Sequence, residues 1–174
     1  MRSVSLRALL PAVISLTMFG VHGSTVATVL GDINTICSDA SALNTAIVAF
    51  PNTGGSLVGA LTIHTYAVNV DTAIRTTETD IKALTPLPIS EADSEAICNA
   101  LLACIGPILE TAFHNFVSKP PSAFTALPVG GLPALIKSDL TNVVTDLDAL
   151  EDALATPCLS TVIPVLQAAL NSVS

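Results

Sequence analysis

The chain has 174 residues, of which 51% are hydrophobic but only 3% are aromatic, and it contains no Trp. After residue 23, four Lys and Arg stand against fourteen Asp and Glu, which gives this part a net charge of −10. That balance excludes the clustered basic residues with which proteins bind nucleic acid. Because Ala, Leu, Val and Ile carry the apolar mass, we expect an aliphatic interior, and such an interior without large rings can leave an apolar channel.

The N-terminal residues 1–23 are typical of a secretory signal peptide. Arg2 and Arg7 form a basic start, residues 9–21 form an apolar stretch, and cleavage is expected after Gly23. The apolar stretch is too short for a transmembrane helix, and no later run is expected to cross a membrane. Residues 24–174 are therefore predicted to form a single domain, secreted to the extracellular space or held in a cell wall.

Three stretches carry the apolar periodicity of amphipathic helices. Within residues 26–47, 63–84 and 136–154, apolar side chains recur at steps of three and four. No alternating strand pattern competes with them. Since short connections make sequential helices antiparallel, the sequence predicts an all-α fold, an antiparallel bundle of about five helices.

Two further helices complete this bundle. Residues 96–109 are apolar on nearly all sides, and Ser90 with Asp93 resembles a capping box that would start this central helix. Pro107 is expected to kink it. The last helix is expected to begin with Thr156 as its N-cap and Pro157 in its first turn.

Four cysteines in an exported chain favour two disulfides, and they are Cys37, Cys98, Cys104 and Cys158. Cys98 and Cys104 are separated by about 9 Å of helical rise and about 120° of rotation, which excludes a bond between them. In an up-and-down bundle all four cysteines would lie at one end. Their heights along the bundle axis favour a bond between Cys37 and Cys104 and another between Cys98 and Cys158. The exchanged pairing is the alternative. Two disulfides at one end would hold that end together and leave the other end freer to open. We therefore expect a ligand entrance at the other end, beside the loops at residues 51–55 and 120–133.

No arrangement of residues indicates catalysis, a cofactor or a metal site. His64 and His114 stand in no hydrolase or metal motif, and Gly55 with Ser56 lacks the G-x-S-x-G turn that presents a nucleophile. His64 is expected on a helix surface or partly buried. Four carboxylates lack the alternation and Gly of a calcium loop and are expected to form a solvated helix face: Asp146, Asp148, Glu151 and Asp152.

The candidates for an apolar interior or channel are inward-facing aliphatic residues of the helical stripes. They are Ile63, Ala67, Val70, Ile74, Leu101, Ile108, Ala112, Val143, Leu147 and Leu150.

Three long segments resemble the fungal hydrophobic surface-binding protein A family, which includes cell-wall galactomannoproteins. They are the run PNTGGSLVGALTIHTYAVNVDTAIRTTETDIKAL from Pro51, ISEADSEAI from Ile89, and ALPVGGLPALIKSDLTNVVTDLDALEDAL from Ala126. The GGSL and LPVGG motifs are the most specific parts. The resemblance covers most of the chain after residue 23.

This resemblance implies a secreted or wall-bound helical protein without enzymatic activity. It implies adsorption to hydrophobic surfaces, recruitment of a secreted polyester hydrolase, and fatty acids held between helices. The acyl chain of such a ligand contributes about 0.8 kcal/mol per buried CH₂. The alternatives are a structural or antigenic cell-wall mannoprotein without a lipid ligand, and a secreted module that binds a protein partner.

Overall fold

The computed structural model describes residues 23–86, 88–124 and 132–172. Apart from Gly23, the predicted signal peptide lies outside the described residues, as does the LPVGG motif. The described residues form five α-helices and one turn of 3-10 helix, which confirms the predicted all-α class. The elements are α1 (Val26–Ala49), α2 (Leu57–Lys82), α3 (Glu91–Val117), η1 (Pro121–Ala123), α4 (Leu132–Leu154) and α5 (Val162–Asn171).

The first three helices begin where a hydroxyl side chain can satisfy a free backbone N–H group. Thr25, Ser56 and Ser90 each accept a hydrogen bond from the backbone N–H three residues further on. The Oγ atom of Ser90 lies 3.1 Å from the backbone N of Asp93, which confirms the predicted cap. Local sequence signals therefore set these helix starts.

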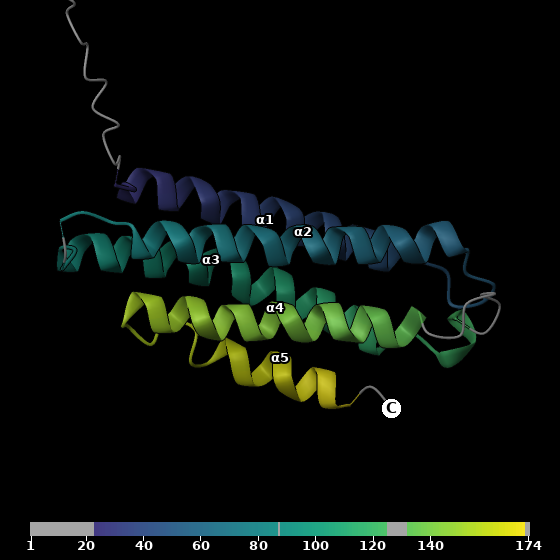
Figure 1. The fold of residues 1–174 in the computed structure, drawn as a ribbon. Coiled ribbons are helices and arrows are strands. Elements are labelled where there is room, and N and C mark those ends of the chain that lie inside the picture. Colours follow the sequence, from purple (N-terminus) through teal and green to yellow (C-terminus); the bar gives the residue numbers. More distant parts are fainter. Residues whose placement is uncertain (1–22, 87, 125–131, 173–174) are drawn as a thin grey trace, which may run out of the picture.

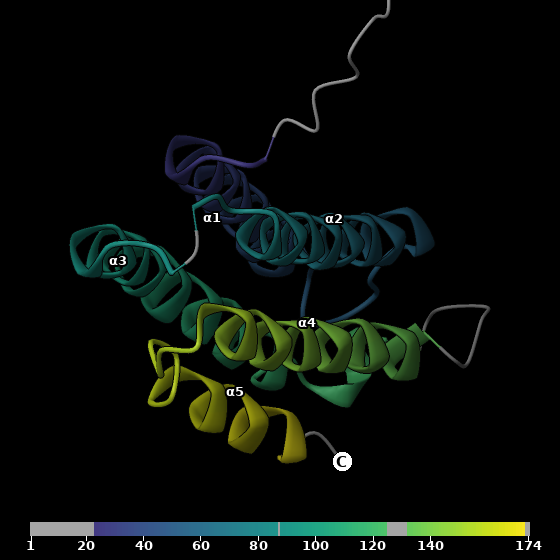
Figure 2. The ribbon, with the colours of Figure 1, turned by 60° about the vertical axis from the view of Figure 1, so that its left-hand side comes forward.

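The five helices form a closed ring in the order α2, α1, α3, α5, α4 (Figures 1 and 2). Antiparallel packing joins α1 to α2, as the sequence predicts. The other two long pairs, α1 with α3 and α2 with α4, are parallel. The side-chain amide of Asn115 of α3 donates to Oδ1 of Asn44 of α1, close to the last turn of both helices, and His64 of α2 meets Asp139 of α4. The sequential helices α2 and α3, and likewise α3 and α4, do not form extensive pairs, and the short helix α5 closes the ring between α3 and α4.

Aliphatic side chains from every helix fill the interior. Among the largest fully buried side chains, Phe113 is accompanied only by Ile and Leu. The inner positions of α1 recur at helical spacing, and they are Val29, Ile33, Ile36, Ala40, Leu43 and Ile47. The ring-poor composition is thus the composition of one continuous core.

Two disulfides cross-link the ring, as predicted. Cys37 is bonded to Cys104 and Cys98 to Cys158, with Cα atoms 5.6 and 5.4 Å apart. The expectation that both lie at one end is wrong. Cys37 and Cys104 occupy the middle of α1 and α3, because these helices run parallel and meet along their length. Only the bond between Cys98 and Cys158 is near an end of the bundle.

The last helix begins later than expected. Helix α5 starts at Val162, and Thr156 and Pro157 lie in the connection before it. The backbone N–H of Leu159 donates to the carboxylate of Glu151, and Cys158 is bonded to α3, so these anchors hold the segment as a loop. The position of a helix start therefore depended here on tertiary contacts.

By length and composition alone, helix α3 meets the criterion for a membrane-spanning helix, contrary to the expectation that no run after the N-terminal apolar stretch does. It runs without a break through Pro107, whose side chain is exposed. A buried core helix meets the same criterion, and α3 is bonded covalently to α1 and to the connection before α5. We therefore interpret α3 as a core helix of the bundle.

Candidate functional site

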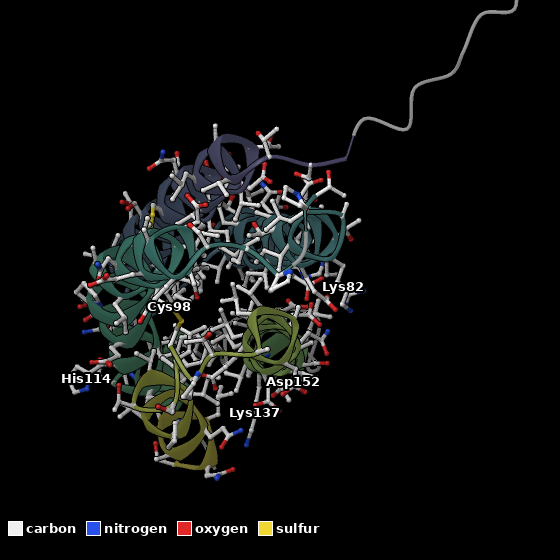
Figure 3. All side chains as sticks on the ribbon, turned by 90° about the vertical axis from the view of Figure 1, so that its left-hand side faces the viewer. Lys82, Cys98, His114, Lys137 and Asp152 are labelled. Atoms are coloured by element: carbon white, nitrogen blue, oxygen red, sulfur yellow. A yellow bond between two sulfur atoms is a disulfide. The ribbon has the colours of Figure 1, made fainter. Side chains whose placement is uncertain are left out.

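A cavity of about 830 Å³ opens where α2 ends, α3 begins and α4 ends. We call it the mouth cavity. Figure 3 views this end of the molecule, with Cys98 beside it. Its lining is mainly apolar and consists of Ile81, Leu84, Pro88, Ile89, Glu91, Ser94, Glu95, Cys98, Ala153, Leu154, Ala155 and Thr156.

Hydroxyl and carboxyl groups gather on one side of the mouth cavity. The Oγ atom of Ser94 lies 3.4 Å from Oγ1 of Thr156, which links α3 to the loop after α4. Glu91 and Glu95 belong to the exposed start of α3, where the positive end of the helix dipole favours acidic side chains. Among the described residues that line this cavity there is no Lys or Arg. The mouth cavity therefore pairs an apolar wall with an acidic, hydroxyl-bearing rim.

Aromatic rings pack together at the opposite end of the bundle, where two cavities of about 190 Å³ each also lie. The ring centroids of Phe50 and Phe124 are 5.2 Å apart, and those of Phe116 and Phe124 are 6.1 Å apart. Gly55 packs against this cluster so closely that a Cβ atom there would lie 2.2 Å from the Phe50 ring. The Lys119 ammonium donates to the Phe50 carbonyl and fixes the end of α1.

The mouth cavity does not lie at the expected ligand entrance. We predicted an entrance beside the loops at residues 51–55 and 120–133, and residues 125–131 of the second loop lie outside the described residues. In the described part, the loop at 51–55 packs on the aromatic cluster, and the mouth cavity lies at the other end. The few large rings are concentrated where they fill the space between helix ends.

The ten candidate channel residues lie in the core or at its edge. Nine are buried with at most 1% of their surface exposed, and Ile108 is partly buried against them. None of the ten lines the mouth cavity. That they line a ligand channel stays a prediction.

The residues of the mouth cavity were not predicted as site residues from the sequence, although part of the apolar pattern that places them there is visible in it. Ile81, Leu84 and Leu154 continue the inner stripes to the ends of α2 and α4. Their meeting follows from the parallel arrangement of these two helices, which periodicity does not reveal. An apolar stripe that continues to the end of a helix is the available clue.

His64 is partly buried, as expected, and its partner explains its position. Its Nδ1 atom lies 2.6 Å from Oδ2 of Asp139, a buried carboxylate of α4. The pair joins α2 to α4 as a structural contact. His114 is exposed in the last turn of α3. Among the described residues, no three His, Cys, Asp or Glu side chains are grouped so that they could hold a metal ion.

The carboxylates of α4 only partly form a solvated face. Asp148 and Asp152 are exposed, as expected. Asp146 instead accepts a hydrogen bond of 2.7 Å from Arg75 of α2, and Glu151 accepts from the Leu159 N–H. The expectation is wrong for these two, because α2 and the loop after α4 pack against that side of the helix.

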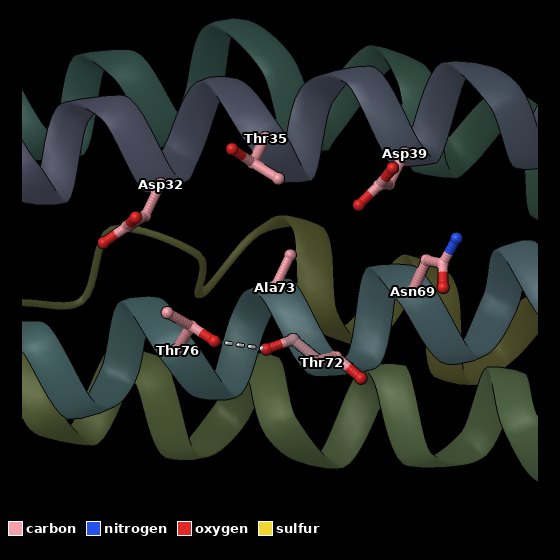
Figure 4. A pocket seen from close by; sticks show the side chains of 7 residues that line it. All are labelled: Asp32, Thr35, Asp39, Asn69, Thr72, Ala73 and Thr76. Atoms are coloured by element: carbon pink, nitrogen blue, oxygen red, sulfur yellow. Dashed lines mark hydrogen bonds between the residues drawn. The ribbon is translucent and has the colours of Figure 1, made fainter.

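Acidic side chains also meet between α1 and α2. A cavity of about 260 Å³ lies there, and Figure 4 shows Asp32 and Asp39 projecting from α1 toward α2. The Oδ2 atom of Asp32 is buried without a hydrogen-bond partner. Burial, followed by a hydrogen bond and repulsion from Asp80, raises the pKa of Asp32 to about 6.

A second carboxyl pair lies between α2 and α4. Burial and the neighbouring Asp146 raise the pKa of Asp71 to about 6, although Arg75 partly opposes this shift. The Arg75 guanidinium contacts both carboxylates, at 3.3 Å from Asp71 and 2.7 Å from Asp146. On each side of α2, one carboxyl group of an acidic pair therefore has a raised pKa: Asp32 on the α1 side and Asp71 on the α4 side.

The sequence matches the family described as hydrophobic surface binding protein A over residues 26–172. No curated protein sequence matches the chain at a significant level. Among solved structures, the chain is similar to the crystal structure of Afmp4p in complex with palmitic acid. The two share 28% sequence identity and a TM-score of 0.71, over 85% of this chain and 96% of Afmp4p.

The family match extends from the start of α1 to the end of α5 and so includes every helix of the ring. The likeness to Afmp4p covers the same helical architecture. The chain therefore belongs to the hydrophobic surface binding protein A family.

Proposed function

We propose that this protein is a secreted or wall-held, non-enzymatic binding protein that takes up the acyl chain of a fatty acid through the mouth cavity. The observation that carries this proposal is the apolar cavity at the end of an aliphatic core. The similarity to Afmp4p, whose crystal structure contains palmitic acid, supports the same class of ligand.

The size and chemistry of the mouth cavity suit a long apolar chain. Its volume of about 830 Å³ lies within the range of about 300–1,000 Å³ that is typical of ligand pockets. Burying twelve or more methylene groups contributes on the order of 10 kcal/mol before entropic costs. Ser94 and Thr156 provide hydroxyl groups at the rim, where the polar head of the ligand would remain in contact with water.

Palmitate binding to the mature chain tests this proposal. Ala153 lines the mouth cavity from α4, so Ala153→Phe is expected to fill it and weaken palmitate binding at least tenfold in titration calorimetry. Ala103→Phe, on the exposed face of α3, is the matched control and is expected to bind as the unmodified protein does. Equal binding by both variants would place the ligand elsewhere, and no palmitate binding by the unmodified protein would refute the proposal.

Adsorption to hydrophobic surfaces forms the second part of the proposed function, and membership of the family supports it. At such a surface, we further propose that the protein recruits a secreted polyester hydrolase. The test compares capture of the hydrolase by protein adsorbed on particles with capture by protein in solution. Capture that requires the particles supports recruitment, and its absence in both settings removes the hydrolase from the proposal.

A further inference from the structure

One half of the α1–α2 hairpin contains no acidic or basic residue other than a single histidine. From Ala40 to Val70 the sequence contains no Asp, Glu, Lys or Arg, although the chain after residue 23 has a net charge of −10. His64 is the exception, and it is paired with Asp139. Bringing this half of the hairpin against an uncharged surface would therefore remove little charge from water.

Exposed apolar side chains gather on the α2 side of this segment. Val58, Leu61 and Val68 are 74%, 43% and 40% exposed, and their spacing places them on one face of α2. Leu135 of α4, 38% exposed, precedes Asp139 by one turn. Since Asp139 meets His64 in the parallel α2–α4 pair, Leu135 lies at the level of Leu61. We call Val58, Leu61, Val68 and Leu135 the adsorption ridge.

The threonines beside the ridge are less polar than their sequence suggests. The hydroxyl groups of Thr62, Thr65 and Thr72 each donate to a backbone carbonyl of their own helix at 2.8 to 2.9 Å. The accepting carbonyls are those of the three ridge residues of α2. Because these donors are already satisfied, their contact with an apolar surface leaves no hydroxyl proton without a partner.

We infer that the adsorption ridge is the face through which the protein lies on an uncharged apolar solid. The ridge is a row of side chains on the outside of a helix, and it offers neither free charge nor free hydroxyl donors. A flat, uncharged apolar surface has no groups that could pair with charges or with hydroxyl donors. This inference rests on the surface-binding part of the proposed function and assigns it to a face distinct from the mouth cavity.

Adsorption to octadecyl-coated silica particles tests the inference with two matched double variants. Val58→Glu with Leu61→Glu places two charges on the ridge. Leu102→Glu with Val165→Glu places the same charges on exposed apolar positions of α3 and α5. The ridge variant is expected to need about tenfold more protein for half-coverage, because two apolar contacts are lost and two charges must be desolvated. The control variant is expected to differ from the unmodified protein by less than twofold.

Four measurements separate the outcomes: adsorption, circular dichroism, palmitate binding and sedimentation. Unmodified protein that fails to adsorb refutes surface binding itself, whereas normal adsorption by the ridge variant refutes only the assignment of the face. Equal loss in both variants also overturns the assignment, because a general effect of charge then explains it. Circular dichroism and retained palmitate binding establish that the ridge variant is folded. A sedimentation shift from dimer to monomer in that variant would identify the ridge as an interface between two copies and overturn the inference.

Discussion

The buried Oδ2 atom of Asp32 has no hydrogen-bond partner, and burial, together with the neighbouring Asp80 of α2, raises the pKa of Asp32. With one proton between Asp32 and Asp80, the pair becomes a hydrogen bond between α1 and α2. Since the folded protein raises the pKa of Asp32 from 3.8 to about 6, it binds this proton more tightly than the unfolded chain does. The contribution to stability is complete below about pH 3.8 and is lost as the pH rises through 6.

We therefore expect the free energy of unfolding to decrease between pH 4 and pH 7, by about 1 kcal/mol or less for this pair because it is partly solvated. Asp32→Asn keeps a hydrogen-bond donor at all pH values and is expected to flatten this dependence. Urea denaturation at several pH values measures it. Asp148→Asn, at an exposed position of α4, is the control, and an unchanged slope in Asp32→Asn would contradict the shared proton.

The rim of the mouth cavity is acidic at Glu91 and Glu95, and a fatty acid carboxylate would enter against this charge. Glu95→Gln is expected to strengthen palmitate binding about two- to fivefold at neutral pH, since exposed charge pairs contribute about 0.2–1 kcal/mol. The gain should shrink at high salt. Calorimetric titration in low and high salt measures it, with Glu110→Gln on α3 as the control, and weaker binding would indicate that the glutamate contacts the ligand.

At the scale of elements, two glycines of the α1–α2 hairpin differ in their surroundings. A methyl group at Gly55 would lie 2.7 Å from the Ala123 carbonyl oxygen as well as against the Phe50 ring, whereas at Gly31, within α1, it would meet no atom within 4 Å.

Gly55→Ala is therefore expected to lower the free energy of unfolding by about 1–3 kcal/mol, because the added methyl group overpacks against the Phe50 ring and the Ala123 carbonyl. Gly31→Ala is expected to raise it by about 0.5–1 kcal/mol, because Ala favours the helix interior. Thermal and urea denaturation of both variants measure these opposite changes. A stabilising effect of Gly55→Ala would mean that the Phe50 ring and the Ala123 carbonyl can move away from the added methyl group at little cost in free energy.

Helices were predictable from the sequence because their determinants are local. The apolar stripes predicted the class, Ser90 predicted one helix start, and cysteine spacing excluded a bond between Cys98 and Cys104. The observed pairing was chosen over the exchanged one by placing all four cysteines at one end, an arrangement that the structure does not have. The order of the helices around the ring was not predictable, since periodicity shows which face of a helix is buried but not which other helix packs against it. The mouth cavity followed from that order, and Thr156 failed as a cap because the anchors of Cys158 and Leu159 are tertiary.

At the scale of the molecule, the disulfides divide the ring into two parts. One bond joins α1 to α3, and the other joins α3 to the start of the segment that leads into α5. Helices α2 and α4 carry no cross-link to this frame. They are held to each other by polar pairs, among them His64 with Asp139 and Arg75 with Asp146. The mouth cavity lies between the two parts, so widening it requires a displacement of α2 and α4 against the frame.

We expect this division to appear in hydrogen exchange. Backbone amides of α2 and α4 should exchange faster than those of α1 and α3 at equal burial, and palmitate should slow the exchange of α2 and α4 most. Mass spectrometry of the oxidised protein with and without palmitate measures both effects. Uniform protection across the four long helices would contradict a movable pair.

The overlap of the two disulfide loops has a consequence for the response of the protein to proteolysis. One loop spans residues 37–104 and the other 98–158, so any single backbone cut between residues 37 and 158 leaves both pieces covalently joined. A nicked molecule therefore keeps its pieces at high effective concentration, and their aliphatic faces can remain packed. Limited proteolysis is expected to produce fragments that separate on a gel only after reduction. A cut in any loop between residues 37 and 158 thus releases no helix, whereas a cut between Cys158 and Val162 releases α5.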